Sequence, residues 1–175
     1  TISRETQTVI DCVHLTLTDE YGHRGRSESI GVDYEGETPA TIIAELEAAR
    51  HKIEAGVSLT EAQRMFPAGG ARNALDCALW DLHAKQTGAR AWEAAGLSSF
   101  EPRPTAFTLG MMDEDALRAL ARVHDGFAFL KVKTDRDRGL DPVRIVHEAA
   151  PNAKLIVDPN EAWRDADLRR YTGQL

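Results

Sequence analysis

The second half of the chain alternates between strand and helix patterns, and this alternation constrains the fold more than any other feature. Three segments have the composition of β-strands and three have amphipathic helix periodicity: strands at 104–109, 127–133 and 153–160, helices at 113–126, 141–151 and 165–175. Equivalent positions recur at a spacing of 25 residues, as Thr108, Lys133 and Asp158 show. Such alternation predicts right-handed βαβ units and a parallel sheet. Because a (β/α)8 barrel uses about 30 residues per unit, we expect the first three units of a TIM-type barrel.

The first half has a different organisation. Residues 8–17 alternate between apolar and polar side chains, and with 23–32 they predict a β-hairpin. Helix patterns follow at 36–56, 58–67 and 71–88, and the segment 89–104 is predicted to be a connector. Thr38 is the expected N-cap of the first helix, and Gly88 is expected to end the last. These patterns predict an α+β domain in front of the partial barrel.

Composition excludes several classes of function. The 175 residues carry a net charge of −7, which argues against nucleic acid as a partner. No apolar run reaches the roughly 18 residues of a membrane-spanning helix. The two cysteines, Cys12 and Cys77, lack the spacing of a metal site, so we interpret them as reduced thiols of a cytoplasmic protein.

Four polar residues lie at the carboxyl ends of two predicted strands. Lys131 and Lys133 are two residues apart, so their side chains share one face of their strand. Asp158 follows the apolar run 155–157, and Asn160 lies on the same face as Asp158. The carboxyl ends of barrel strands are where active sites form. We therefore expect these side chains to lie together in a catalytic site.

The chemistry of these residue types fits proton abstraction beside a carboxylate. Adjacent ammonium groups disfavour each other's charged form, and a lysine in its neutral form can act as a general base. A carboxylate on the neighbouring strand can hold Mg²⁺, and that cation stabilises the enediolate that forms. Two ordinary interpretations stay open: a Lys-x-Lys pair is common on solvated strand edges, and an Asp after a strand is often a helix cap.

Several motifs together resemble the enolase superfamily, in its muconate-lactonising subgroup and of the dipeptide epimerase (L-Ala-D/L-Glu epimerase) type. They are "LKVK", "LIVDPNEAW", the helix "PAGGARNALDCALWDLHAKQTG" and, near the start, "TISR". The resemblance implies an α+β capping domain over residues 1–98, with its N-terminal strand possibly missing. It implies the first part of a (β/α)7β TIM-type barrel over residues 99–175.

The resemblance also implies a role for each matching residue. Lys133 would be the acid/base residue at the substrate α-carbon, and Lys131 would assist it. Asp158 would be the first of three Mg²⁺ ligands, and Asn160 would orient that site from behind the ligand. The substrate would be a small dipeptide, in a homo-oligomeric enzyme.

Two further residues are implied to contact the substrate. Arg4 would reach from the capping domain toward the distal carboxylate of a dipeptide, and Thr108 would contact the substrate from the end of the first barrel strand. Because the other metal ligands and the second lysine of the family lie beyond Leu175, we expect the chain to be part of a longer protein.

Two groups of alternatives remain. Related enzymes of the same superfamily share the proton-abstraction step, namely a cycloisomerase, an N-acylamino-acid racemase and an o-succinylbenzoate synthase. A truncated, non-catalytic binding module is the alternative from another class.

Overall fold

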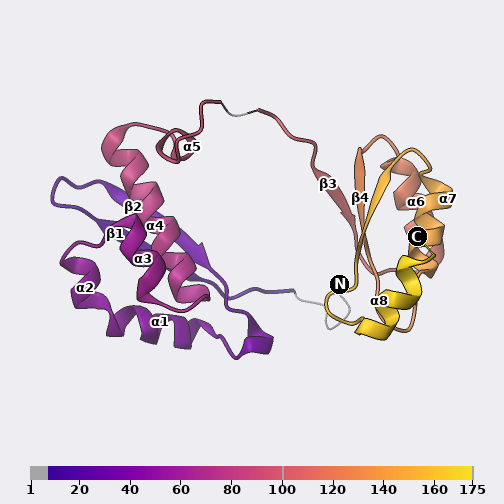
Figure 1. Ribbon diagram of the computed structural model, residues 1–175, viewed down its shortest axis with the longest axis horizontal. Helices are drawn as coiled ribbons and strands as arrows, with labels where there is room; N and C mark the ends of the chain where they lie inside the picture. Colours follow the sequence, from indigo (N-terminus) through magenta and orange to yellow (C-terminus); the bar gives the residue numbers. More distant parts are fainter. Residues whose placement is uncertain (1–7, 100, 175) are drawn as a thin grey trace. The chain divides into compact units, whose positions relative to one another are not determined.

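The computed structural model describes residues 8–99 and 101–174 and divides the chain into two compact units (Figure 1). The first unit is Val9–Glu101, and the second begins at Pro102. Each unit has its own cluster of buried apolar side chains. The two units are therefore described separately.

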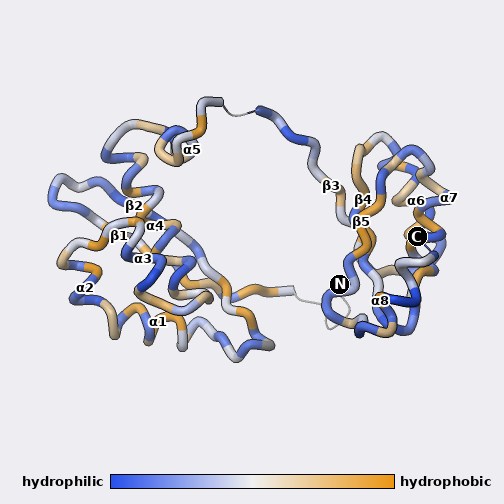
Figure 2. The backbone as a smooth tube through the Cα atoms, viewed as in Figure 1, coloured by the Kyte–Doolittle hydropathy of each residue, from blue (hydrophilic) through white to orange (hydrophobic). Residues whose placement is uncertain are grey.

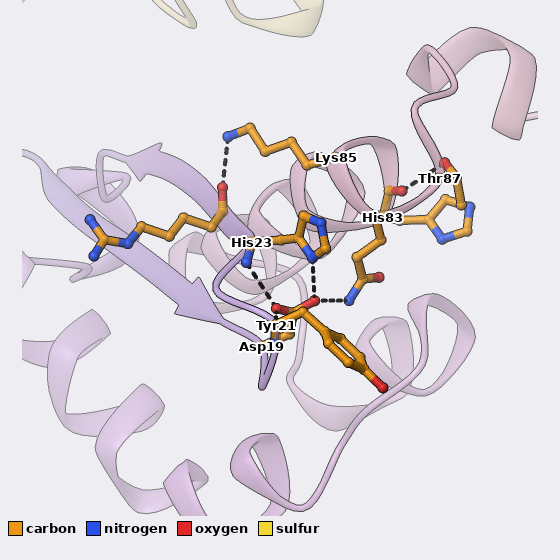
Figure 3. A network of polar contacts seen from close by, with 8 residues as sticks. Asp19, Tyr21, His23, His83, Lys85 and Thr87 are labelled. Atoms are coloured by element: carbon orange, nitrogen blue, oxygen red, sulfur yellow. Dashed lines mark hydrogen bonds and ion pairs between the residues drawn. The ribbon is translucent and has the colours of Figure 1, made fainter.

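The first unit contains a two-stranded antiparallel hairpin formed by β1 (Val13–Thr18) and β2 (Arg24–Ser29). Asp19 organises the turn that joins them (Figure 3). Its Oδ1 accepts hydrogen bonds from the backbone N–H groups of Tyr21 and His23, each at 2.9 Å. Its Oδ2 lies 2.9 Å from Nδ1 of His23 and accepts a 2.8 Å bond from Nε2 of Gln86. A single carboxylate thus ties the predicted hairpin to a helix.

That helix is α4 (Gly70–Thr87), which packs across β2. The Ser27 and Ser29 hydroxyls donate to the carbonyls of Ala74 and Gly70 at 2.7 and 2.9 Å. Both serines are buried, so these bonds satisfy groups that have lost contact with water. The contact fixes α4 on one face of the hairpin.

Shorter helices complete the first unit. They are the 3-10 helix η1 (Asp33–Glu35) and the α-helices α1 (Pro39–Ala48), α2 (Arg50–Glu54), α3 (Leu59–Met65) and α5 (Ala91–Ala94). Thr38 caps α1 as predicted, and Ser58 caps α3 in a reciprocal arrangement with Glu61. The single helix predicted over 36–56 is divided, because Ala49 adopts φ −95° and ψ −2° between α1 and α2. The predicted connector contains α5.

The second unit has a three-stranded parallel sheet in the order β3-β4-β5. Its strands are β3 (Ala106–Leu109), β4 (Phe129–Lys133) and β5 (Lys154–Asp158). Each is followed by a helix: α6 (Glu114–Val123), α7 (Asp141–Ala149) and α8 (Asp165–Thr172). The helices gather on one side of the sheet (Figure 1). This order confirms the predicted start of an α/β barrel.

The two faces of this sheet differ in chemistry. Leu109, Leu130 and Val132 are fully buried and pack in one cluster with α6 and α7. Figure 2 shows hydrophobic residues along β4 and β5, whereas α8 is largely hydrophilic. Strand alternation puts Lys131 and Lys133 on the face opposite to Leu130 and Val132. None of the described helices has the length and apolar character needed to cross a membrane.

Candidate active site

The candidate site lies where β4 and β5 end. In the parallel ladder Lys133 is the partner of Asp158, and Lys131 is the partner of Ile156, two residues earlier. The backbone N–H of Thr134 donates to the Asp158 carbonyl at 3.2 Å, so the two strands stay paired one residue further. This register puts both lysines within reach of one carboxylate.

Four side chains converge at this end. Nζ of Lys131 lies 2.6 Å from Oδ2 of Asp158, and Nζ of Lys133 lies 2.7 Å from the same oxygen. Nζ of Lys133 also donates to Oδ1 of Asn160 at 2.6 Å. The structure therefore brings together four of the residues predicted from the sequence.

Burial within this cluster is uneven. The Lys133 side chain is 12% exposed, that of Asp158 21%, and that of Lys131 36%. Lysine is almost never buried to this degree without a partner. Lys133 is thus held from two sides below the surface, while Lys131 keeps contact with solvent.

Burial and hydrogen bonding have opposite effects on the pKa of Asp158. Partial burial by itself would raise the pKa of this carboxyl, but hydrogen bonds from Lys131 and Lys133 and from the Asn160 backbone N–H outweigh it. The result is a pKa lowered from 3.8 to about 2. Asp158 therefore carries a full negative charge at neutral pH.

The turn after β5 has an unusual backbone. Asn160 and Glu161 adopt φ values of 46° and 65°, which place two consecutive residues other than glycine in the left-handed region. The backbone N–H of Asn160 donates to Oδ1 of Asp158 at 2.9 Å. Both oxygens of the carboxylate are therefore engaged.

The remaining predicted site residues are less closely associated with this cluster. Thr108 is the ladder partner of Lys131 on β3, and its side chain is exposed. Arg4 lies outside the described residues. Thr108 thus lies on the same face of the sheet as Lys131, and its role in substrate binding and that of Arg4 both stay predictions.

One residue at the site has a contact that the sequence interpretation missed. The ring of Trp163 packs against that of Tyr171 at a centroid distance of 4.7 Å. Its Nε1 also donates to the carbonyl of Asp135 at 3.0 Å. A partly buried indole N–H usually finds an acceptor, and that rule is the signal that could have revealed the bond.

The oxygen atoms of this cluster could supply part of the ligands of a Mg²⁺ site. Asp158 and Asn160 present hard oxygen atoms, which Mg²⁺ prefers. Among residues 8–99 and 101–174, no group of three His, Cys, Asp or Glu side chains could hold a metal ion. Asp158 is therefore suited to be one ligand of a larger set.

Comparison with known proteins identifies the class to which this arrangement belongs. Residues 1–96 match the family model of the mandelate racemase / muconate lactonizing enzyme N-terminal domain. The chain belongs to this family, which confirms the resemblance to the enolase superfamily and its dipeptide epimerase type.

Individual relatives make the similarity more specific. The chain is 36% identical over 152 residues to an L-Ala-D/L-Glu epimerase of Escherichia coli K12, covering 86% of this chain and 47% of that protein. An enolase family member from Agrobacterium tumefaciens with homology to dipeptide epimerases, solved with sodium and L-Ala-L-Glu, matches with a TM-score of 0.88 and 36% identity. A dipeptide epimerase from Methylococcus capsulatus, complexed with Mg and L-Arg-D-Lys, matches with a TM-score of 0.78 and 27% identity.

These matches cover nearly all of this chain but only part of each related protein. Each of the two structures covers 99% of this chain, whereas the chain covers 53% of each of them. The chain thus spans about half the length of the relatives that it matches.

Proposed function

We propose that this chain carries the acid/base lysine and the first metal ligand of a Mg²⁺-dependent dipeptide epimerase. The observation that carries the proposal is the position of Lys133. Its Nζ lies 2.7 Å from Oδ2 of Asp158 and 2.6 Å from Oδ1 of Asn160, at the carboxyl end of a parallel strand. The family similarity supports the same assignment.

In this proposal, residues of this chain accept the substrate α-proton and position the group that accepts it. A lysine accepts a proton only as the neutral amine, so Lys133 takes the substrate α-proton onto Nζ after its ammonium has released a proton to water. Asp158 and Asn160 keep Nζ at a fixed place between the two strand ends. Lys131, which is more exposed, presents a positive charge to the substrate carboxylate.

Asp158 and, behind it, Asn160 are the residues that would hold Mg²⁺ from this chain. When bound, the cation supplies positive charge that offsets the negative charge developing on the substrate carboxylate as the α-proton leaves. Because Asp158 is ionised at neutral pH, it is ready to coordinate a cation without losing a proton.

The substrate class follows from the relatives. An L-Ala-D/L-Glu epimerase and two structures with bound dipeptides lie among the matches, and we propose a dipeptide of the L-Ala-D/L-Glu type. Thr108 and Arg4 remain the proposed substrate contacts, and a homo-oligomeric, cytoplasmic enzyme remains part of the proposal.

Exchange of the substrate α-proton with solvent deuterium tests the proposed function. With Mg²⁺ and L-Ala-L-Glu, we expect the protein to incorporate deuterium at the α-carbon. Lys133→Ala should slow this exchange by about 10²- to 10⁴-fold, the usual contribution of a general base. Mass spectrometry of the recovered dipeptide measures it.

Lys154→Ala is the matched control. Lys154 is an exposed lysine at the opposite end of β5, so its removal should leave exchange unchanged. If Lys133→Ala exchanges as fast as Lys154→Ala, Lys133 is not the base. Exchange with N-acylamino acids but not with dipeptides would instead favour the racemase alternative, and Mg²⁺ binding without any exchange would favour the non-catalytic module.

A further inference from the structure

The turn that follows β5 has a backbone that its own residues do not favour. Asn160 tolerates the left-handed region better than most residues, but Glu161, also at positive φ, has no such tolerance. Such backbone persists only where the surrounding structure holds it. The contacts of this turn should therefore include a group that prevents it from relaxing.

Trp163 supplies such a group. It lies two residues after Glu161, and its indole N–H donates to the Asp135 carbonyl at 3.0 Å. Asp135 itself lies two residues after Lys133. The bond therefore joins the segment after β5 to the segment after β4, beyond the last backbone pair of the two strands.

The acceptor end of this bond is well anchored. The buried Thr134 hydroxyl donates to the Gly139 carbonyl at 2.7 Å, and the Arg138 backbone N–H donates to Oδ1 of Asp135 at 2.8 Å. Nη1 of Arg138 also donates to the Met112 carbonyl at 2.7 Å. Trp163 thus attaches the strained turn to a rigid loop.

From this geometry we infer that Trp163 is a positioning residue for Lys133. Its N–H holds the left-handed turn at Asn160 and Glu161, and the turn in turn holds Oδ1 of Asn160 against Nζ of Lys133. In this inference Trp163 acts through Asn160 and not on the substrate itself. The kinetic part of this inference rests on the proposed function, whereas its structural part does not.

Substitutions can separate the N–H of Trp163 from the packing of its ring. Trp163→Phe keeps an aromatic ring beside Tyr171 and removes the N–H. Glu161→Gly removes the steric penalty of positive φ, because glycine populates that region freely. If Trp163 acts by holding the turn, Glu161→Gly should compensate for the loss of the indole N–H.

The experiment compares Trp163→Phe, Glu161→Gly and the double variant with the unchanged protein. Trp80→Phe, on α4 in the other unit, is the matched control.

NMR hydrogen exchange follows the Asn160 amide, whose N–H is bonded to Asp158. Initial rates with L-Ala-L-Glu give kcat and KM. We expect Trp163→Phe to speed exchange of this amide about tenfold, with the Leu130 and Val132 amides unchanged. Its kcat should fall about tenfold at constant KM.

Two results would overturn the inference. One is a Trp163→Phe variant whose Asn160 amide exchanges no faster than in Trp80→Phe. The other is a double variant whose Asn160 amide exchanges as fast, and whose kcat is as low, as in Trp163→Phe. Glu161→Gly would then not compensate, and the effect of Trp163→Phe would come from lost ring packing. A protein without epimerase activity would contradict the proposed function, and the amide exchange would still decide the role of Trp163.

Discussion

Asp158 is the residue on which the candidate site converges, because one of its oxygens accepts from two ammonium groups. Lys131 and Lys133 approach Oδ2 at 2.6 and 2.7 Å. Two ammonium groups that share one oxygen would repel each other if the carboxylate did not lie between them. The same charges compete with any cation that approaches Oδ2 of Asp158.

Asp158→Asn should weaken Mg²⁺ binding by about tenfold or more, since a neutral amide replaces the only carboxylate of the described cluster. Isothermal titration of the protein with Mg²⁺ measures the effect. Asp165→Asn, at an exposed acid that begins α8 in the same unit, removes the same charge and should leave the affinity within about twofold. Equal affinities for the two variants would exclude Asp158 as a ligand.

At the residue scale, the sequence predicted the positions of side chains that follow from the alternation of faces along a strand. Lys131, Lys133 and Asp158 could be placed together because a parallel ladder aligns the ends of adjacent strands. The turn at Glu161 could not be predicted, because a residue with a Cβ gives no signal for positive φ. Its conformation depends on contacts such as the bond from Trp163 to Asp135, and neither partner is marked as a pair by sequence spacing.

At the scale of elements, β2 and α4 of the first unit approach each other closely. Gly25 faces the helix, and a Cβ at this position would overlap the Ala78 carbonyl and the backbone and Cβ of Leu82. The obstructing atoms are largely helix backbone, which cannot turn aside as a side chain can. The absence of a side chain at Gly25 therefore determines how near α4 lies to the hairpin.

Gly25→Ala should destabilise the first unit by about 2 kcal/mol, within the usual range for overpacking. Gly126→Ala is the matched control, since a Cβ there would meet no atom within 4 Å. Urea unfolding followed by circular dichroism measures both free energies of unfolding. Equal stability of the two variants would show that α4 can move away from β2 at little cost.

Element boundaries were predictable where a local rule determines them. Thr38 caps α1 and Gly88 ends α4 in a left-handed conformation at φ 70°, and both follow from residue preference. The break at Ala49 was missed, because alanine favours helix continuation and no proline or glycine marks the site. Tertiary context can override that preference, and Ile42 and Leu46 of α1 are buried in the core of the unit.

At the scale of the whole molecule, each of the two units carries a carboxylate whose pKa is strongly lowered. In the first unit hydrogen bonds from Gln86 and His23 bring the pKa of Asp19 to about 2, and in the second unit Asp158 also has a pKa of about 2. An unfolded Asp titrates near 3.9. Both groups therefore contribute stability that is complete above about pH 4 and is lost as the pH falls toward 2.

Asp19→Asn should reduce the acid sensitivity of the first unit and leave that of the second unchanged. The variant loses the ionisable group, so its free energy of unfolding should fall less between pH 6 and pH 3 than in the unchanged protein. Hydrogen exchange of β1 and β4 amides at several pH values reports each unit separately. A parallel decline in both proteins would show that the Asp19 contacts do not drive acid unfolding.

The overall architecture was the most predictable level, because the 25-residue recurrence and the switch in pattern near residue 100 are properties of long segments. Many residues contribute to such a signal, so single exceptions do not obscure it.

The ion-paired resting state of Lys133 also affects unwanted chemistry. A lysine attacks an aldehyde through a free lone pair, and Lys133 has none while its ammonium is bound to oxygens of Asp158 and Asn160. An outward-facing amine such as Lys154 is more accessible to sugar aldehydes than Lys133 is. The contacts that place the base for its reaction thus also shield it from adventitious carbonyl adducts.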